Sequence, residues 1–83
     1  MTLLYFAWVR QRIGKSEEQL VLPPHITTAA ALLAHLQSLG GGYADALSDP
    51  ARLRIAVNQV HGGFDAAIAG TDEVAIFPPV TGG

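Results

Sequence analysis

The sequence predicts an α+β fold in which a β-sheet is covered on one face by one main helix. Its 83 residues are enough for one small domain. The apolar, aromatic stretch at residues 2–9 and the alternating stretch at residues 73–77 are typical of strands. Between them, apolar residues recur at helical spacing, at Ala29, Leu32, Leu33, Leu36 and Leu39. One helix can cover only one face of such a sheet.

The first stretch, residues 2–9, is predicted to be a central strand because both of its faces are apolar. Alternation places Leu3, Tyr5, Ala7 and Val9 on one face, and Leu4, Phe6 and Trp8 on the other. A turn at residues 14–16 leads to a weaker strand at residues 17–22. The two strands are expected to form an antiparallel hairpin.

The main helix is expected to begin after Pro23-Pro24, with Thr27 or Thr28 as its N-cap. The glycine triplet at residues 40–42 is interpreted as its C-terminal stop and loop. Glycine-rich loops that bind phosphate precede a helix, whereas this triplet follows one.

The second half of the chain is expected to alternate short strands and turns. Residues 43–49 are assigned a helical turn and residues 52–58 a third strand, followed by a turn at 61–63 and a short strand or extended link at 64–68. The last strand is expected at residues 73–77, after a turn at 70–72. If the first and last strands are neighbours, the uncovered face exposes Phe6, Trp8 and Phe77.

Composition excludes several classes of function. A net charge of −2 and five scattered basic residues argue against nucleic-acid binding. The absence of cysteine excludes a disulfide scaffold and a cysteine nucleophile. Three dispersed histidines, at 25, 35 and 61, predict no metal site. With no signal peptide and no apolar run of bilayer length, a soluble cytoplasmic protein without a membrane partner is expected.

The C-terminal residues are the best candidates for chemistry. Proline cannot donate to a sheet ladder, so the domain is expected to span residues 1–77 and a flexible tail residues 78–83. Gly82-Gly83 can enter a slot too narrow for any other residue. With no pocket-lining polar cluster expected, the reactive group is inferred to be the main-chain carboxylate. A partner enzyme could convert it to an acyl-adenylate and then to a thiocarboxylate.

A composition of 49% hydrophobic and only 14% charged residues predicts an exposed docking patch, and the uncovered sheet face beside the tail is the expected place. The outward-facing Arg52 and Arg54 either contact an acidic patch of a partner or are plain solvated charges.

Three segments together resemble the small subunit of molybdopterin synthase: residues 4–7 (Leu-Tyr-Phe-Ala) with residues 9–10 (Val-Arg), residues 56–59 (Ala-Val-Asn-Gln), and residues 72–83, which end in Phe-Pro-Pro-Val-Thr-Gly-Gly. The resemblance runs over the whole chain in the right order. Departures are confined to turns. The usual turn before the last strand is acidic-Gly-Asp, whereas Gly70-Thr71-Asp72 has its glycine one position earlier, and residues 61–63 are unusually rich in glycine.

The resemblance implies a ubiquitin-like β-grasp sulfur carrier with a mixed sheet. It implies that Gly83 is adenylated by an E1-like adenylyltransferase, which uses ATP and a sulfur donor, and that the carrier itself binds no cofactor. The thiocarboxylate then donates sulfur to the cyclic pyranopterin precursor of the molybdenum cofactor. The carrier would be the non-catalytic subunit of a heterotetramer in which two small subunits flank a large-subunit dimer.

The resemblance also assigns roles to residues of this chain. The tail residues expected to enter the large subunit are Pro78, Pro79, Val80, Thr81 and Gly82, and the expected partner-facing residues are Phe6, Trp8, Arg10 and Phe77.

Three alternatives stay open at this point. The first is a related β-grasp carrier that serves thiamine, cysteine or tRNA thiolation. The second is a ubiquitin-like modifier joined to lysines of other proteins. The third is a plain interaction module whose tail has no chemical role.

Overall fold

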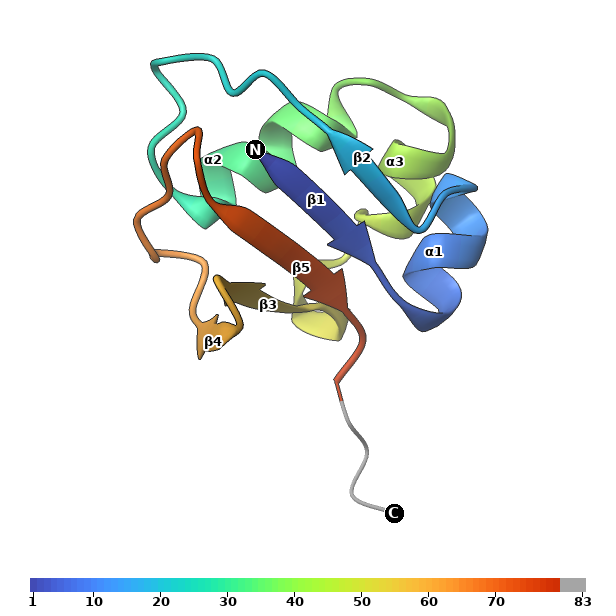
Figure 1. The fold of residues 1–83 in the computed structure, drawn as a ribbon. Helices are drawn as coiled ribbons and strands as arrows, with labels where there is room; N and C mark the ends of the chain where they lie inside the picture. Colours follow the sequence, from blue (N-terminus) through green and yellow to red (C-terminus); the bar gives the residue numbers. More distant parts are fainter. Residues whose placement is uncertain (80–83) are drawn as a thin grey trace.

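A computed structural model describes residues 1–79, which form a five-stranded mixed sheet with its helices on one face and at one edge (Figure 1). The elements in chain order are β1 (Thr2–Tyr5), α1 (Ala7–Ile13), β2 (Glu17–Gln19), α2 (Ala29–Gln37), α3 (Gly41–Ala46), the 3₁₀ turn η1 (Pro50–Arg52), β3 (Arg54–Val57), β4 (Val60–Gly62) and β5 (Glu73–Phe77). The strand order in the sheet is β2-β1-β5-β3-β4. Only the β1–β5 pair is parallel.

The predicted first strand is correct at its start and wrong in its length. β1 ends at Tyr5, and Ala7 has a φ of +53°, a left-handed conformation that turns the chain out of the sheet. Residues 7–13 then form α1, which ends where Gly14 takes a φ of +92° and donates its N–H to the Arg10 carbonyl at 2.8 Å. β1 and β2 do pair antiparallel as predicted, but β2 is shorter than predicted and α1 lies between them in the chain.

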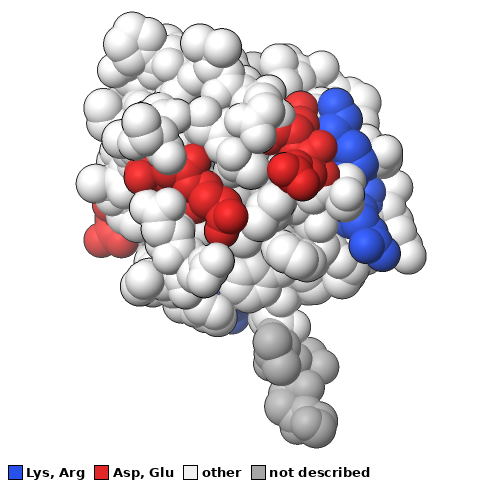
Figure 2. Space-filling model, in the orientation of Figure 1, with Lys and Arg blue, Asp and Glu red and all other residues white. Residues whose placement is uncertain are grey.

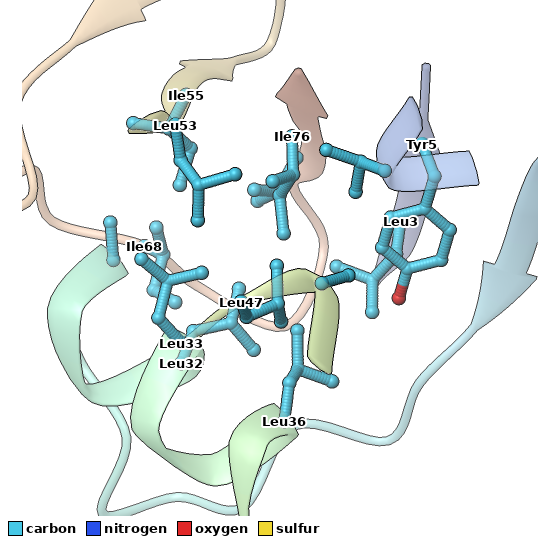
Figure 3. Packing of buried hydrophobic residues seen from close by; sticks show 14 of the residues in the cluster. Leu3, Tyr5, Leu32, Leu33, Leu36, Leu47, Leu53, Ile55, Ile68 and Ile76 are labelled. Carbon is cyan, nitrogen blue, oxygen red and sulfur yellow. The ribbon is translucent and has the colours of Figure 1, made fainter. Parts of the chain in front are cut away.

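The main helix, α2, begins as predicted but ends at Gln37, so Leu39 of the predicted stripe lies beyond the helix and is exposed. The Thr28 hydroxyl accepts a hydrogen bond from the Ala31 N–H at 3.2 Å, which caps the helix. The apolar stripe packs against the sheet, and Figure 3 shows Leu32, Leu33 and Leu36 facing Leu3, Ile55 and Ile76 across the core. Burial of these side chains supplies most of the stabilisation of so small a domain.

The glycine triplet does not form the predicted loop, because it opens a further helix. Gly40 is the N-cap of α3, and it and Gly41 have φ values of +76° and +55°. A Cβ on Gly42 would lie 2.2 Å from the Arg12 carbonyl oxygen, so α3 can approach α1 closely only with glycine there. The helical turn predicted at residues 43–49 is thus the later part of α3.

The region after α3 holds two further corrections. β3 spans residues 54–57 rather than 52–58, because residues 50–52 form η1, in which Asp49 accepts the Ala51 N–H. Residues 61–62, predicted as a turn, belong to β4; the turn itself lies at Asn58 and Gln59, whose φ values of +51° and +69° suit a tight hairpin. Residues 64–68, predicted as a short strand or extended link, begin with a turn at Phe64 and Asp65, in which the Ala66 N–H donates to the Gly63 carbonyl, and then form one bridge, between Thr28 and Ala67.

The last strand forms with the predicted bounds. The expectation that the first and last strands are neighbours is confirmed. β5 lies between β1 and β3 in the middle of the sheet. Val74 and Ile76 are buried against the helices, while Ala75 and Phe77 lie on the opposite face. Within residues 1–79, no helix is long and apolar enough to cross a membrane.

Candidate functional site

The chain leaves the sheet at the end of β5. Pro78 and Pro79, both half-buried, follow Phe77 directly and have no backbone N–H with which to extend the ladder. Because β5 is central, this exit lies between β1 and β3 (Figure 1). Of the residues assigned to the tail, Val80, Thr81, Gly82 and Gly83 lie outside the described part of the chain.

An apolar patch lies on the uncovered face of the sheet beside this exit; we call it the face patch, and its members are Leu4, Phe6, Ala56, Ala75 and Phe77. Phe6 is exposed, Ala56 is buried and the other three are half-buried. The strand register places Leu4, Ala75 and Ala56 in one row across β1, β5 and β3. Phe6 continues the line of β1, because its N–H donates to the Ile76 carbonyl at 3.3 Å, and its side chain is 47% exposed. An exposed phenylalanine on a sheet face is a candidate contact for a partner.

Charged and polar groups lie around the face patch. Figure 2 shows carboxylates in two groups across this face, Lys and Arg at the α1 edge, and mainly uncharged surface down to the exit. Glu17 pairs with Leu4 in the register of β1 and β2, and Glu73 begins β5. The His61 ring packs edge-on against Phe77, with 5.3 Å between the ring centroids. The patch is thus an apolar centre with a polar rim, as in protein interfaces.

Two of the four residues predicted to face a partner, Phe6 and Phe77, do lie on the uncovered face. Trp8 does not, because it belongs to α1 rather than to an extended first strand. Arg10 is exposed on the same helix and lines a shallow surface groove with Gln11, Gly14, Lys15 and Ser16. The structure thus groups Phe6 with Phe77, and places Trp8 and Arg10 on the adjoining helix.

Trp8 has two cationic neighbours that the sequence did not bring together. The Arg12 guanidinium carbon lies 4.8 Å from the centroid of the Trp8 ring, and the Arg52 guanidinium carbon lies 5.1 Å from it. Trp8 and Arg12 are four residues apart on α1, which is a helical spacing. That spacing could have indicated the contact, but reading residues 2–9 as a strand concealed it.

Hydrogen bonds around Asn58 fix the start of β5. Its side-chain amide donates to Asp72 Oδ1 at 2.9 Å, and its Oδ1 accepts the Glu73 N–H at 3.0 Å. Asp72 Oδ2 accepts the Ala69 N–H at 2.7 Å. The hydrogen bond from Asn58, followed by that from the Ala69 backbone, lowers the pKa of Asp72. This arrangement sets where β5 begins, and therefore where the chain leaves the sheet.

A second polar cluster joins β1, β2 and α3 on the helical side. The Glu18 carboxylate accepts the Tyr5 hydroxyl at 2.7 Å and the Tyr43 hydroxyl at 2.6 Å, with Lys15 Nζ 3.4 Å away. Burial alone would raise the pKa of Glu18, but the bonds from Tyr43 and Tyr5 and the charge of Lys15 lower it overall. The pKa of Tyr5 is raised mainly by its burial, and further by its hydrogen bond to Glu18 and the charge of that carboxylate. The cluster is structural, because the Tyr5 side chain is buried.

Among the described residues, no three His, Asp or Glu side chains gather into a group that could hold a metal ion.

The fold is that of the ubiquitin-like β-grasp class. The structure is similar to that of a protein from Pyrococcus furiosus described as molybdopterin converting factor subunit 1, with a TM-score of 0.76 and 26% identity over 95% of each chain. It is also similar to the modifier protein SAMP1 from Haloferax volcanii, with a TM-score of 0.73 over 100% of this chain and 98% of that one. Because its identity to this chain is 24%, the similarity to SAMP1 supports the fold alone.

The chain belongs to the ThiS family, whose model matches residues 3–83. It is 39% identical to the molybdopterin synthase sulfur carrier subunit of Haemophilus influenzae, over 100% of this chain and 99% of that one. It is 40% identical to the protein of the same name from Escherichia coli, over 98% of this chain and 96% of that one.

Proposed function

We propose that this protein is the sulfur carrier subunit of a molybdopterin synthase. The observation that carries the proposal is identity of about 40% over essentially the whole length to two proteins of that name. The family match reaches residue 83, so it includes the Gly82-Gly83 end. The face patch beside the exit of the chain, with its exposed Phe6, supports the same function, since a carrier must dock while its end reaches into a partner.

The proposed chemistry takes place at the carboxylate of Gly83. Attack of this carboxylate on ATP forms an acyl-adenylate and releases pyrophosphate. A sulfide equivalent from a sulfur donor then displaces AMP and leaves a thiocarboxylate. Transfer of that sulfur to the pyranopterin precursor, with oxygen from water replacing it, restores the carboxylate. The ATP and the sulfur donor are used by an activating enzyme of the E1 type, and the carrier binds neither.

Each part of the chain has a separate role in this proposal. Pro78 and Pro79 stop sheet pairing, so the chain can leave the domain at this point. Val80, Thr81 and Gly82 then enter a channel of the large subunit, and because glycine has no side chain, the end of the chain can pass a narrow part of that channel. Phe6 and Phe77 dock on the rim of that channel, and Arg10 contacts the partner beside them. Two carriers flank a large-subunit dimer in the cytoplasm.

Intact-mass measurement tests the activation step. The protein is incubated with the E1-like enzyme of its own host, ATP and a sulfur donor. The proposal predicts a mass gain equal to the replacement of one oxygen by one sulfur, and no gain when Gly83 is deleted. Absence of the gain in the wild-type protein, with the activating enzyme shown to be active on ATP, would contradict the proposal.

The same reaction separates the remaining alternatives. A protein modifier would give products larger than the free chain, joined to lysines of other proteins. A carrier for another sulfur pathway would acquire the thiocarboxylate but would not bind the large subunit of molybdopterin synthase. A plain interaction module would remain unchanged in mass.

A further inference from the structure

The end of the sheet from which the chain leaves carries arginines on both sides. The chain has four arginines in all, at residues 10, 12, 52 and 54, although its net charge is −2. Arg10 and Arg12 lie on α1, which begins directly after Phe6, and Arg54 pairs with Phe77 in the register of β3 and β5. Figure 1 shows the first turn of α1 and the yellow turn η1 at the same end of the sheet as the end of β5.

Trp8 joins these two groups of arginines. Its ring contacts Arg12 from its own helix and Arg52 from η1, at 4.8 and 5.1 Å. Cation–π contact of this kind holds a guanidinium in place while leaving its N–H groups free to bind. Arg12 and Arg52 are both exposed, and the facing Asp45 carboxylate lies 3.9 Å from Arg12 and is itself mostly in solvent. The arginines are thus ordered but only weakly neutralised.

An ordered Trp–Arg group at a surface has the composition of an interface anchor. Tryptophan and arginine are the residues most enriched where binding energy concentrates, and arginine binds carboxylates through paired hydrogen bonds. A solvated arginine loses side-chain entropy on binding, whereas these two are already restrained by the Trp8 ring. The group also adjoins the face patch, since Trp8 follows Phe6 by two residues.

We propose that Trp8, Arg12 and Arg52 form a cationic anchor that binds a carboxylate-bearing surface of the large subunit, next to the channel that receives the tail. The proposal rests on the proposed function and adds to it the chemistry of the partner surface. The end of the tail is negative, so the channel must be cationic or neutral inside. A carrier with a cationic group beside the exit and a negative tip therefore fits a channel whose rim is acidic on that side, and the two charges together fix the direction of docking.

The test is calorimetric titration of this protein against the isolated large subunit from the same host. Arg12→Gln and Arg52→Gln should each weaken binding by about fivefold to tenfold. Val21→Glu is the matched control, because Val21 is 93% exposed and the substitution also changes the charge by one negative unit. It should leave the affinity nearly unchanged. Thermal unfolding of each variant checks that the fold is retained.

Two further measurements distinguish an anchor from a merely structural contact. The affinity of the wild-type protein should fall as salt is added, and it should fall less steeply for Arg52→Gln. Arg52→Lys keeps the charge but loses the planar contact with Trp8, so its affinity should lie between those of the wild type and Arg52→Gln.

Failure of this inference and failure of the proposed function give different results. If the wild-type protein binds and the arginine variants lose no more affinity than Val21→Glu, the anchor is wrong and the proposed function stands. If the wild-type protein does not bind the large subunit, both are wrong.

Discussion

Asn58 and Glu73 are joined by two hydrogen bonds, one in each direction. The Asn58 N–H donates to the Glu73 carbonyl at 2.8 Å, and the Glu73 N–H donates to Asn58 Oδ1 at 3.0 Å. Asn58 follows β3 and Glu73 begins β5, so this pair fixes the register of the central strand. Because β5 ends at Phe77, the same pair determines where Pro78 leaves the sheet.

Asn58→Gly tests this relationship without introducing backbone strain, since glycine tolerates the φ of +51° at this position. Loss of the side-chain hydrogen bonds should lower the free energy of unfolding by about 1–3 kcal/mol, measured by urea titration. Gln59→Gly is the control, because Gln59 has a similar φ of +69° and an exposed side chain. Equal stability of the two variants would show that the Asn58 amide does not hold β5.

Gly42→Ala tests the close approach of α1 and α3. The added Cβ would lie 2.2 Å from the Arg12 carbonyl oxygen, so one of the helices must move. We expect a loss of about 1–3 kcal/mol in the free energy of unfolding. Gly70→Ala is the control, because a Cβ there meets no heavy atom within 4 Å. A Gly42→Ala variant as stable as Gly70→Ala would contradict the packing described for α3.

The lowered pKa of Glu18 makes stability depend on pH. A carboxyl whose pKa is lower in the folded state stabilises the fold above its unfolded pKa, about 4, and this contribution is lost as the pH falls through the folded pKa. The unfolding midpoint in urea should therefore drop as the pH is lowered below about 4. Asp72, whose pKa is also lowered, contributes in the same direction.

The Glu18→Gln variant isolates the contribution of Glu18 to this dependence of stability on pH. Both hydroxyls donate to Glu18 Oε2, and a neutral amide oxygen is a weaker acceptor than a carboxylate oxygen, so stability at neutral pH should fall by about 1–3 kcal/mol. The remaining acid dependence should be shallower than in the wild type. An unchanged pH profile would mean that Glu18 is not charged in this cluster.

Phe6→Glu tests the face patch as a docking surface. The Phe6 side chain is 47% exposed, so the substitution should leave the fold intact, as circular dichroism would show. Affinity for the large subunit should fall at least about tenfold, because a charge replaces an apolar contact at the centre of an interface. Val21→Glu carries the same added charge away from the patch. Equal affinities for the two variants would remove Phe6 from the interface.

The elements predicted best from the sequence are those whose local pattern and tertiary packing agree. In β5, buried and half-buried residues alternate, a turn precedes the strand and two prolines follow it, so its bounds could be predicted from residues 70–79 alone. α2 combined a Thr28 cap with an unbroken leucine stripe. Phe6 and Phe77 could be placed on the uncovered face because β1 and β5 are neighbours.

The elements that were missed depend on single backbone conformations. Tyr5-Phe6-Ala7-Trp8-Val9 has the composition of a strand, and only the left-handed Ala7 ends it. α3 begins within a glycine triplet because Gly42 allows close packing on α1, a contact distant in sequence. The Trp8–Arg52 contact joins residues more than forty positions apart, so no local pattern could have indicated it.

The central claim is tested most directly by sulfur transfer from the thiocarboxylated protein. It is mixed with the large subunit of its host and the pyranopterin precursor, and its intact mass is followed with time. We predict that the mass returns to that of the carboxylate while molybdopterin forms, and that Gly82→Val retains its sulfur because it cannot enter the channel. Persistence of the thiocarboxylate in the wild-type protein, or equal loss of sulfur when the precursor is omitted, would contradict the assignment as the carrier of molybdopterin synthase.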